Sequence, residues 1–230
     1  MLSFTEENYL KALVQLTIFE EGVTEVGVNR LAEYLGVKPA TVSDMVRKLK
    51  KKALVNYERY GKISLTEEGR FLGMMVIRRH RLWETFLQQK LDFSWDEVHE
   101  LAEDLEHIHS KKLINRLDAF LDHPEFDPHG DAIPNKEGEI LIPFRRTLND
   151  GESGKRYKII AVKDNSSEFL KYLDKLGIAI NDEATIINKE SFDELITIRF
   201  NGKERVLSPK VTDYLFVICA SCLKAKKCDC

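Results

Sequence analysis

The sequence predicts an α+β protein that is mainly α, with a winged helix-turn-helix domain, a helical middle segment and a small β-barrel at its C-terminal end. Two observations predict this order. Up to about residue 121, apolar side chains recur at helical spacing, interrupted only by short β-like runs around Gly61. Beyond about residue 155, short β-rich runs alternate with turn residues. The helical part therefore precedes the β part.

The N-terminal part is expected to hold three helices and a β-wing. A first helix over about residues 5–20 ends before Gly22. The segment VNRLAEYLGV forms a second, closed by Gly36, and KPATVSDMVRKLKKKALV forms a third, with Pro39 in its first turn. Two short strands within residues 56–66 then complete the order of a winged helix-turn-helix unit.

The middle of the chain is expected to be helical. A long helix runs over Glu67–Leu91, a fifth over Ser94–His109 and a sixth over Ser110–Leu121. The following segment, HPEFDPHGDAIPNKEGE, has three prolines and two glycines, so it predicts a loop and a domain boundary.

The C-terminal part is expected to be a small β-barrel of about 75 residues. Its strands are RYKIIAVK, ATIINK, LITIRF, RVLS and DYLFVI, and SSEFLKYLDKLG forms one helix among them. The expected divisions are a DNA-binding domain at 1–73, a helical domain at 74–138, the β domain at 139–220 and a cysteine-rich tail at 221–230.

Composition predicts a cytoplasmic protein without a membrane span. The N-terminus lacks the basic and apolar segments of a secretion signal, and the uncharged apolar runs are too short to cross a bilayer. All four cysteines, Cys219, Cys222, Cys228 and Cys230, fall near the C-terminus, which excludes a disulfide framework distributed through the fold. Their spacing does not match paired zinc knuckles, and either a mobile thiol-bearing tail or a separate soft-metal site would explain them.

Charge is distributed unevenly, although the net charge is only -3. Between Lys38 and Lys62 there are eight Lys or Arg residues against Asp44 and Glu58, whereas residues 91–109 contain seven Asp or Glu and no Lys or Arg. The first segment therefore favours phosphates and the second favours cations.

The third helix carries the expected DNA contacts. Residues at the N-terminal end of a recognition helix must be small, polar or basic to reach bases, and nearby cations neutralise phosphates. Lys50 and Lys52 belong to the phosphate-neutralising group. An amphipathic helix with a solvated basic face is the alternative. The expected DNA-binding residues are Lys38, Pro39, Ala40, Thr41, Ser43, Asp44, Arg47, Lys48 and Lys51.

The acidic segment carries the expected metal ligands. On an ideal helix the side chains of His99, Glu103, Glu106 and His107 share an arc about 100° wide beside an apolar face. His80 and Glu84 share a face of the preceding helix, and the loop adds Asp127 and His129. Each fragment alone is a common surface pattern, but together they predict a site with nitrogen and oxygen ligands.

These fragments, in this order, resemble the iron- and manganese-dependent repressors of the diphtheria-toxin-repressor family. The matching segments are ENYLKAL, LGVKPATVSDMVRKL, LTEEG, IRRHRLWETFL, VHELAEDLEHIHS and RLDAFLDHPEFDPHGDAIP, followed by the β-rich part. The resemblance implies a homodimer that binds a palindromic operator in double-stranded DNA only when metallated. It also implies a dimerisation and metal-binding domain and a C-terminal SH3-like, FeoA-like domain.

The resemblance also implies two ligand sets. The core regulatory set falls on Asn8, His80, Glu103, Glu106 and His107, and the second set on Glu84, Asp127, His129 and Asp164, with His99 at an ancillary position. This chain has Asn8 where manganese sensors commonly have aspartate, Lys11 where some have glutamate, and Asp127 where relatives often have cysteine.

Oxygen and imidazole ligands suit Mn(II), Fe(II) and Zn(II), and the absence of a thiolate from the set favours Mn(II) over Fe(II). Zn(II) is expected to bind in vitro. We therefore expect a metal-dependent repressor that controls metal homeostasis genes, not an enzyme. One alternative is a metal-dependent hydrolase that uses the His/Glu/Asp cluster, although the sequence has no motif for its acid-base group. Another is a winged-helix protein whose acidic helix makes only protein contacts.

Overall fold

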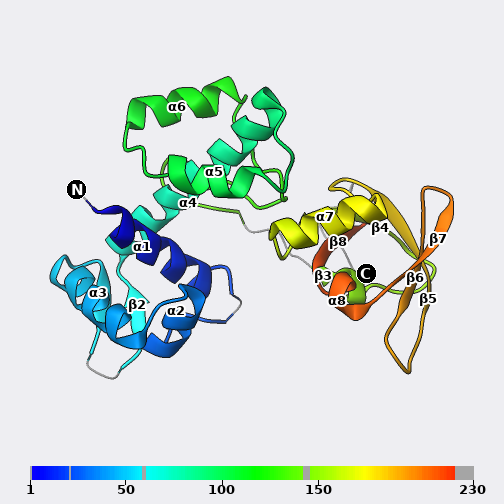
Figure 1. Cartoon of the computed structure of the whole chain (residues 1–230), viewed down its shortest axis with the longest axis horizontal. Coiled ribbons are helices and arrows are strands. Elements are labelled where there is room, and N and C mark those ends of the chain that lie inside the picture. Colours follow the sequence, from blue (N-terminus) through cyan, green and yellow to red (C-terminus); the bar gives the residue numbers. More distant parts are fainter. Residues whose placement is uncertain (1, 21, 59–60, 142–145, 221–230) are drawn as a thin grey trace. The chain divides into compact units, whose positions relative to one another are not determined.

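The computed structural model describes residues 2–20, 22–58, 61–141 and 146–220. The chain forms two compact units (Figure 1). Unit 1 comprises residues 1–83, 101–125 and 133–141, and unit 2 comprises residues 84–100, 126–132 and 142–230.

The first part of unit 1 is the winged helix-turn-helix predicted from the sequence. Its elements are α1 (Phe4–Thr17), α2 (Val28–Tyr34), α3 (Pro39–Lys51), β1 (Val55–Tyr57) and β2 (Ile63–Leu65), and the two strands pair antiparallel. Ser3 caps α1 in a capping box with Glu6, and Pro39 occupies the first turn of α3. Gly36 turns the chain between α2 and α3 with a φ of +64°, a left-handed conformation that favours glycine.

One apolar core holds these elements together. Leu10 and Leu13 of α1, Leu31 of α2, Leu49 of α3 and Ile63 of β2 are all fully buried and belong to the same cluster. Residues spaced three or four apart on each helix supply it, which is why helical periodicity predicted this part well.

Three further helices follow the wing: α4 (Glu67–Leu91), α5 (Val98–Leu105) and α6 (Lys111–Phe120). The helix expected over Ser94–His109 is shorter than predicted, and Glu106 and His107 lie in the turn that follows it. The side chain of Arg79 donates to the backbone carbonyl of Glu106. This tertiary contact occupies the carbonyl at the helix end, and sequence periodicity cannot reveal it.

Unit 2 contains a six-stranded antiparallel sheet in the order β3-β8-β4-β5-β6-β7. Bulges interrupt the register in β4 and β5. Its elements are β3 (Arg146–Thr147), the 3-10 turn η1 (Leu148–Asp150), β4 (Arg156–Val162), α7 (Ser167–Leu176), β5 (Glu183–Lys189), β6 (Ile196–Phe200), β7 (Lys203–Leu207), α8 (Pro209–Thr212) and β8 (Leu215–Cys219).

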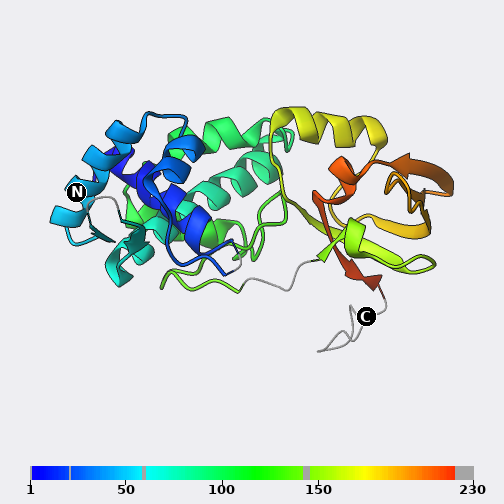
Figure 2. The same cartoon turned by 90° about the horizontal axis from the view of Figure 1, so that it is seen from below.

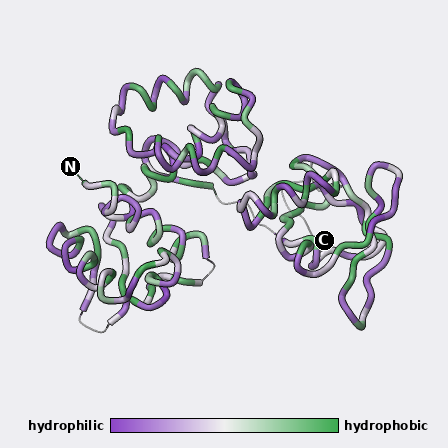
Figure 3. Tube along the Cα trace, viewed as in Figure 1, coloured by the Kyte–Doolittle hydropathy of each residue, from purple (hydrophilic) through white to green (hydrophobic). Residues whose placement is uncertain are grey.

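Helix α7 lies along one side of this sheet (Figure 2) and buries Leu170 and Leu173 in the same core as Tyr157, Ile186 and Val217. Hydrophobic and hydrophilic segments alternate along the strands and α7 (Figure 3), as expected for elements with one buried face. Strands with α7 among them thus form the β-rich part that the sequence predicts, and the short helix α8 and the turn η1 are additions that it did not predict.

Among the described residues, no helix combines the length and apolar character needed to cross a membrane. Cys219 is buried at the end of β8 and is a free thiol. Cys222, Cys228 and Cys230 lie outside the described residues.

Candidate metal centre and DNA reader

The unit 1 cluster consists of Glu7, Lys11, His80, Glu106 and His107, and it begins at the first turn of α1. Glu6 and Glu7 are both buried there. The Oε2 atom of Glu7 lies 2.7 Å from Nδ1 of His107, and its Oε1 atom accepts a hydrogen bond from Arg79 Nη2 at 2.6 Å. Because a buried carboxylate is costly without partners, these two contacts are what hold Glu7 inside.

Glu106 is at the centre of this cluster, with a side chain only 2% exposed. Its Oε2 atom lies 2.7 Å from Lys11 Nζ and 2.6 Å from His80 Nδ1, while its Oε1 atom lies 4.0 Å from His107 Nε2. Burial alone would raise the pKa of Glu106, but hydrogen bonding by His80 and the positive charge of Lys11 hold this pKa below its usual value. Glu106 is therefore an anion in the metal-free protein.

The ring of His107 is oriented by its neighbours. Its Nδ1 faces the Glu7 carboxylate, and Phe4 stacks on the ring with centroids 4.5 Å apart and planes 13° from parallel. In the neutral ring, a hydrogen bond to Glu7 favours the hydrogen on Nδ1, so the lone pair is then on Nε2, which lies 4.0 Å from Glu106 Oε1. A carboxylate that holds one ring nitrogen so that the other can coordinate is typical of metal-bound histidines.

The structure brings together His80, Glu106 and His107 of the expected core set. Asn8 is exposed, and the neighbouring Glu7 occupies the buried position instead. Glu103 lies at the edge, with a side chain 58% exposed and its Oε1 atom 3.8 Å from Lys11 Nζ. Glu7 is not among the ligands expected from the sequence, because an acidic residue in the first turn of a helix is already explained by the helix dipole.

The second cluster lies entirely in unit 2. Ligand-type atoms of Glu84, Asp127 and His129 lie within 4.8 Å of one another, and all three side chains are buried. His129 Nε2 lies 2.7 Å from the backbone oxygen of Trp95, whereas its buried Nδ1 has no hydrogen-bond partner in the described part of the chain. Nδ1 lies 3.7 Å from Glu84 Oε1. A buried nitrogen of this kind beside carboxylates fits a metal ligand.

The same surroundings shift the protonation of His129. Burial alone would lower its pKa, but the carboxylate of Glu84, with a further contribution from Asp127, raises the pKa of His129 to about 9. Without metal, the ring is therefore a cation at neutral pH. A proton then provides the positive charge that the carboxylates require.

The loop around His129 is fixed by local hydrogen bonds. Asp127 Oδ1 accepts from the backbone N–H of His129 at 2.8 Å and of Asp131 at 2.9 Å. Gly130 between them has a φ of +84°, and a Cβ there would lie 2.0 Å from the backbone oxygen of Ile160. Only glycine fits this position, so the loop that presents Asp127 and His129 depends on it.

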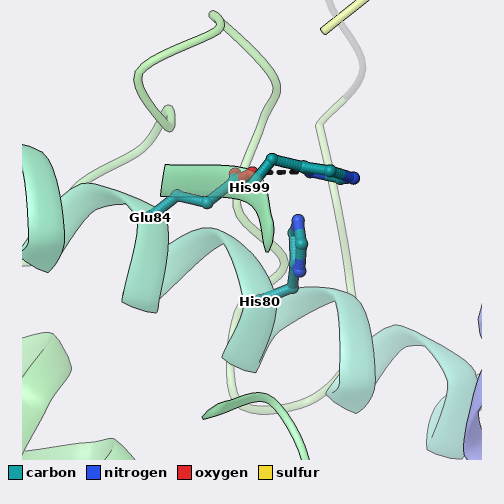
Figure 4. A group of neighbouring side chains, drawn as sticks. All are labelled: His80, Glu84 and His99. Carbon is teal, nitrogen blue, oxygen red and sulfur yellow. Dashed lines mark hydrogen bonds and ion pairs between the residues drawn. The ribbon is translucent and has the colours of Figure 1, made fainter. Parts of the chain in front are cut away.

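His99 and Asp164 lie at the rim of the unit 2 cluster. Figure 4 shows the His99 ring against Glu84, at 3.1 Å from Oε1, with His80 one turn before Glu84 on α4. Asn165 Nδ2 lies 3.1 Å from His99 Nδ1. Asp164, His99, Asp96, Glu100 and Asn165 line a cavity of about 380 Å³ together with Ser166 and Ser167. Asp164 thus lines the same cavity as His99 and is not part of the group formed by Glu84, Asp127 and His129.

The reader helix α3 presents the expected DNA contacts. It buries Val42, Val46 and Leu49. Ser43 is half-buried and donates to the backbone oxygen of Pro39. The other expected residues are exposed: Lys38, Pro39, Ala40, Thr41, Asp44, Arg47, Lys48 and Lys51.

Two lysines of the basic run make contacts within the protein. Lys50 Nζ donates to the backbone oxygen of Tyr57 at 2.5 Å, and Lys52 Nζ lies 2.7 Å from Glu6 Oε1. Lys50 and Lys52 therefore have partners within the protein as well as exposed side chains. Lys48 and Lys51 are exposed too, and the phosphate role of these lysines stays a prediction.

Three family profiles match consecutive parts of the chain. Residues 1–63 match the iron dependent repressor N-terminal DNA binding domain, and residues 66–135 match the iron dependent repressor metal binding and dimerisation domain. Residues 146–219 match the FeoA domain.

Individual proteins agree with these profiles. The iron-dependent repressor IdeR of Mycobacterium tuberculosis is 37% identical over 130 residues, which is 56% of this chain and only 55% of IdeR. The diphtheria toxin repressor of Corynebacterium efficiens is 31% identical over 209 residues, covering 86% of this chain and 88% of that protein.

Solved structures of repressors share the fold. A manganese-dependent transcriptional repressor in complex with manganese has a TM-score of 0.83 and 33% identity, covering 93% of this chain and 99% of that one. ScaR with bound Zn2+ has a TM-score of 0.75 and 30% identity, covering 93% and 98%. These relatives are repressors, so the hydrolase alternative has no support from them.

Proposed function

The chain belongs to the family of iron-dependent repressors, and we propose that it is a metal-dependent transcriptional repressor that binds a palindromic DNA operator as a homodimer. Mn(II) is the proposed metal and Fe(II) the alternative, with metal homeostasis genes as targets and the cytoplasm as location. We propose the domain roles to be DNA binding at 1–73, dimerisation and metal binding at 74–138, and an SH3-like domain at 139–220.

One observation carries the proposal: each unit contains a histidine with one ring nitrogen held by a fixed partner and the other beside a glutamate. His107 faces Glu7 with Nδ1 and Glu106 with Nε2, and His129 faces the Trp95 carbonyl with Nε2 and Glu84 with Nδ1. When bound, a divalent ion would add positive charge beside these carboxylates. Oxygen and imidazole donors suit Mn(II) and Fe(II).

The first turn of α1 connects the unit 1 cluster to the reader helix. Glu7 contacts His107, and the adjacent Glu6 contacts Lys52, the residue that ends α3. A ligand that fixes His107 also restrains this turn and, through Lys52, the end of α3. Metal binding would thereby favour one orientation of the reader and act as a corepressor.

The experiment is selection of operator DNA from a random double-stranded library with and without Mn(II), followed by binding assays on the selected sequence. We expect Mn(II) to be required, and His107→Ala to abolish metal-dependent binding while the protein stays folded. His123→Ala is the matched control, because His123 is 70% exposed and lies outside both clusters. Equal binding by His107→Ala and wild-type protein would contradict the proposed regulatory role of the unit 1 cluster.

The proposed ligands are expected to contribute unequally to Mn(II) affinity. We propose that His80, Glu106 and His107 serve the unit 1 site and that Glu84, Asp127 and His129 serve the unit 2 site, with Glu103, His99 and Asp164 at their edges. Asn8→Ala should have less effect than Glu106→Ala on Mn(II) binding measured by calorimetry, since Asn8 is exposed.

A further inference from the structure

Lys11 lies within the unit 1 cluster, one helical turn after Glu7 on α1. Its side chain is only 15% exposed. The ammonium nitrogen lies 2.7 Å from Glu106 Oε2, 3.2 Å from His80 Nδ1 and 3.8 Å from Glu103 Oε1. A positive charge is thus surrounded by the same oxygen and nitrogen atoms that would bind a metal ion.

The Glu106 carboxylate has two sides, and they face different groups. Oε2 faces Lys11 and His80, whereas Oε1 faces Nε2 of His107 at 4.0 Å. A cation could be held on either side. The position beside Oε2 already contains the Lys11 ammonium, and the position beside Oε1 faces Nε2 of His107.

We propose that Lys11 is a specificity-determining residue: a built-in cation that takes one of the two cation positions on Glu106 and lowers the affinity of the unit 1 cluster for divalent metal. This inference rests on the proposed function. A divalent ion on the His107 side meets the repulsion of a positive charge on the same carboxylate, and an ion on the other side must displace that charge. Both effects act at the Glu106 side chain, which is only 2% exposed, and charges interact strongly where water is excluded.

The test removes the charge and counts bound metal. We would use the full chain with His129→Ala to remove a ligand of the unit 2 cluster, and measure Mn(II) binding by electron paramagnetic resonance of the free ion. Lys11→Met and Lys11→Gln should bind Mn(II) at least about tenfold more tightly, or bind one more ion per chain. If Lys11 had only a structural role, its removal would instead weaken Mn(II) binding.

Two control variants are needed: one keeps the positive charge at position 11, and the other removes a positive charge at a distant, exposed position. Lys11→Arg retains the cation, and Lys175→Met makes the same charge change at an exposed site on α7 of unit 2; neither should tighten binding. Lys11→Gln decides the result if circular dichroism shows that Lys11→Met does not fold.

Unchanged or weaker Mn(II) binding by Lys11→Gln, at the same stoichiometry, would overturn the inference. The outcome can be separated from failure of the proposed function. That function fails if the protein with Lys11 and both clusters intact binds no Mn(II), whereas the inference fails if that protein binds Mn(II) and removal of Lys11 changes nothing.

Discussion

The protonation of His129 predicts how the stability of the metal-free protein depends on pH. Glu84 and Asp127 raise the pKa of this buried histidine from 6.5 to about 9. Because the folded-state pKa is the higher one, the folded protein binds the proton more tightly than the unfolded chain does. The resulting stability is fully present below about pH 6.5 and is lost as the pH rises to about 9. At about 1.4 kcal/mol per pH unit, the loss is about 3 kcal/mol.

Urea unfolding of EDTA-treated protein at several pH values would measure this change. His129→Gln removes the titrating ring, so the difference in pH slope between wild-type protein and this variant isolates its contribution. His123→Gln, at an exposed position, should leave the slope as it is in the wild type. If wild-type protein and His129→Gln lost the same stability between pH 6.5 and 9, within about 1 kcal/mol, the proposed charge on His129 would be wrong.

Three further changes test other parts of the structure. Gly130→Ala places a Cβ 2.0 Å from the Ile160 oxygen at a positive φ, so thermal unfolding should show a loss of more than about 2 kcal/mol, and a neutral effect would contradict this geometry. Glu7→Ala removes the carboxylate partner of Arg79, whose side chain is 12% exposed, and should lower the free energy of urea unfolding by about 3 kcal/mol. A loss below about 1 kcal/mol would contradict a strongly desolvated ion pair. Lys48→Ala should reduce the salt dependence of DNA binding by about one ion without altering the preferred bases, and an altered base preference would argue against a phosphate contact.

Most of the fold could be predicted from the sequence, because its elements bury one face in a regular pattern. Leu10, Leu13 and Leu49 follow helical spacing, and Pro39 marks the start of α3. The end of α5 could not be predicted in this way. At this end Arg79 donates to the Glu106 carbonyl, a contact between residues far apart in the chain that periodicity does not reveal.

The candidate ligands were partly predictable for a related reason. Spacing placed His80 and Glu84 on one face of a helix, and the structure confirms their one-turn separation on α4. Spacing cannot say which partner each side chain meets. His80 Nδ1 lies beside Glu106 within unit 1, while Glu84 contacts His99 and His129 within unit 2.

Glu7 and Asn8 are adjacent on α1, but only Glu7 is buried. The two side chains are about 100° apart on α1, and intrinsic preference would place the carboxylate in water and the amide nearer the core. The structure buries Glu7 because Arg79 and His107 meet it there, and a buried carboxylate with such partners avoids most of its desolvation cost. A helix that buries acidic residues therefore requires cations or imidazoles from other segments, and here Arg79 of α4 and His107 from the turn after α5 supply them. Matching acids on one helix with bases on the helix it packs against would have identified Glu7.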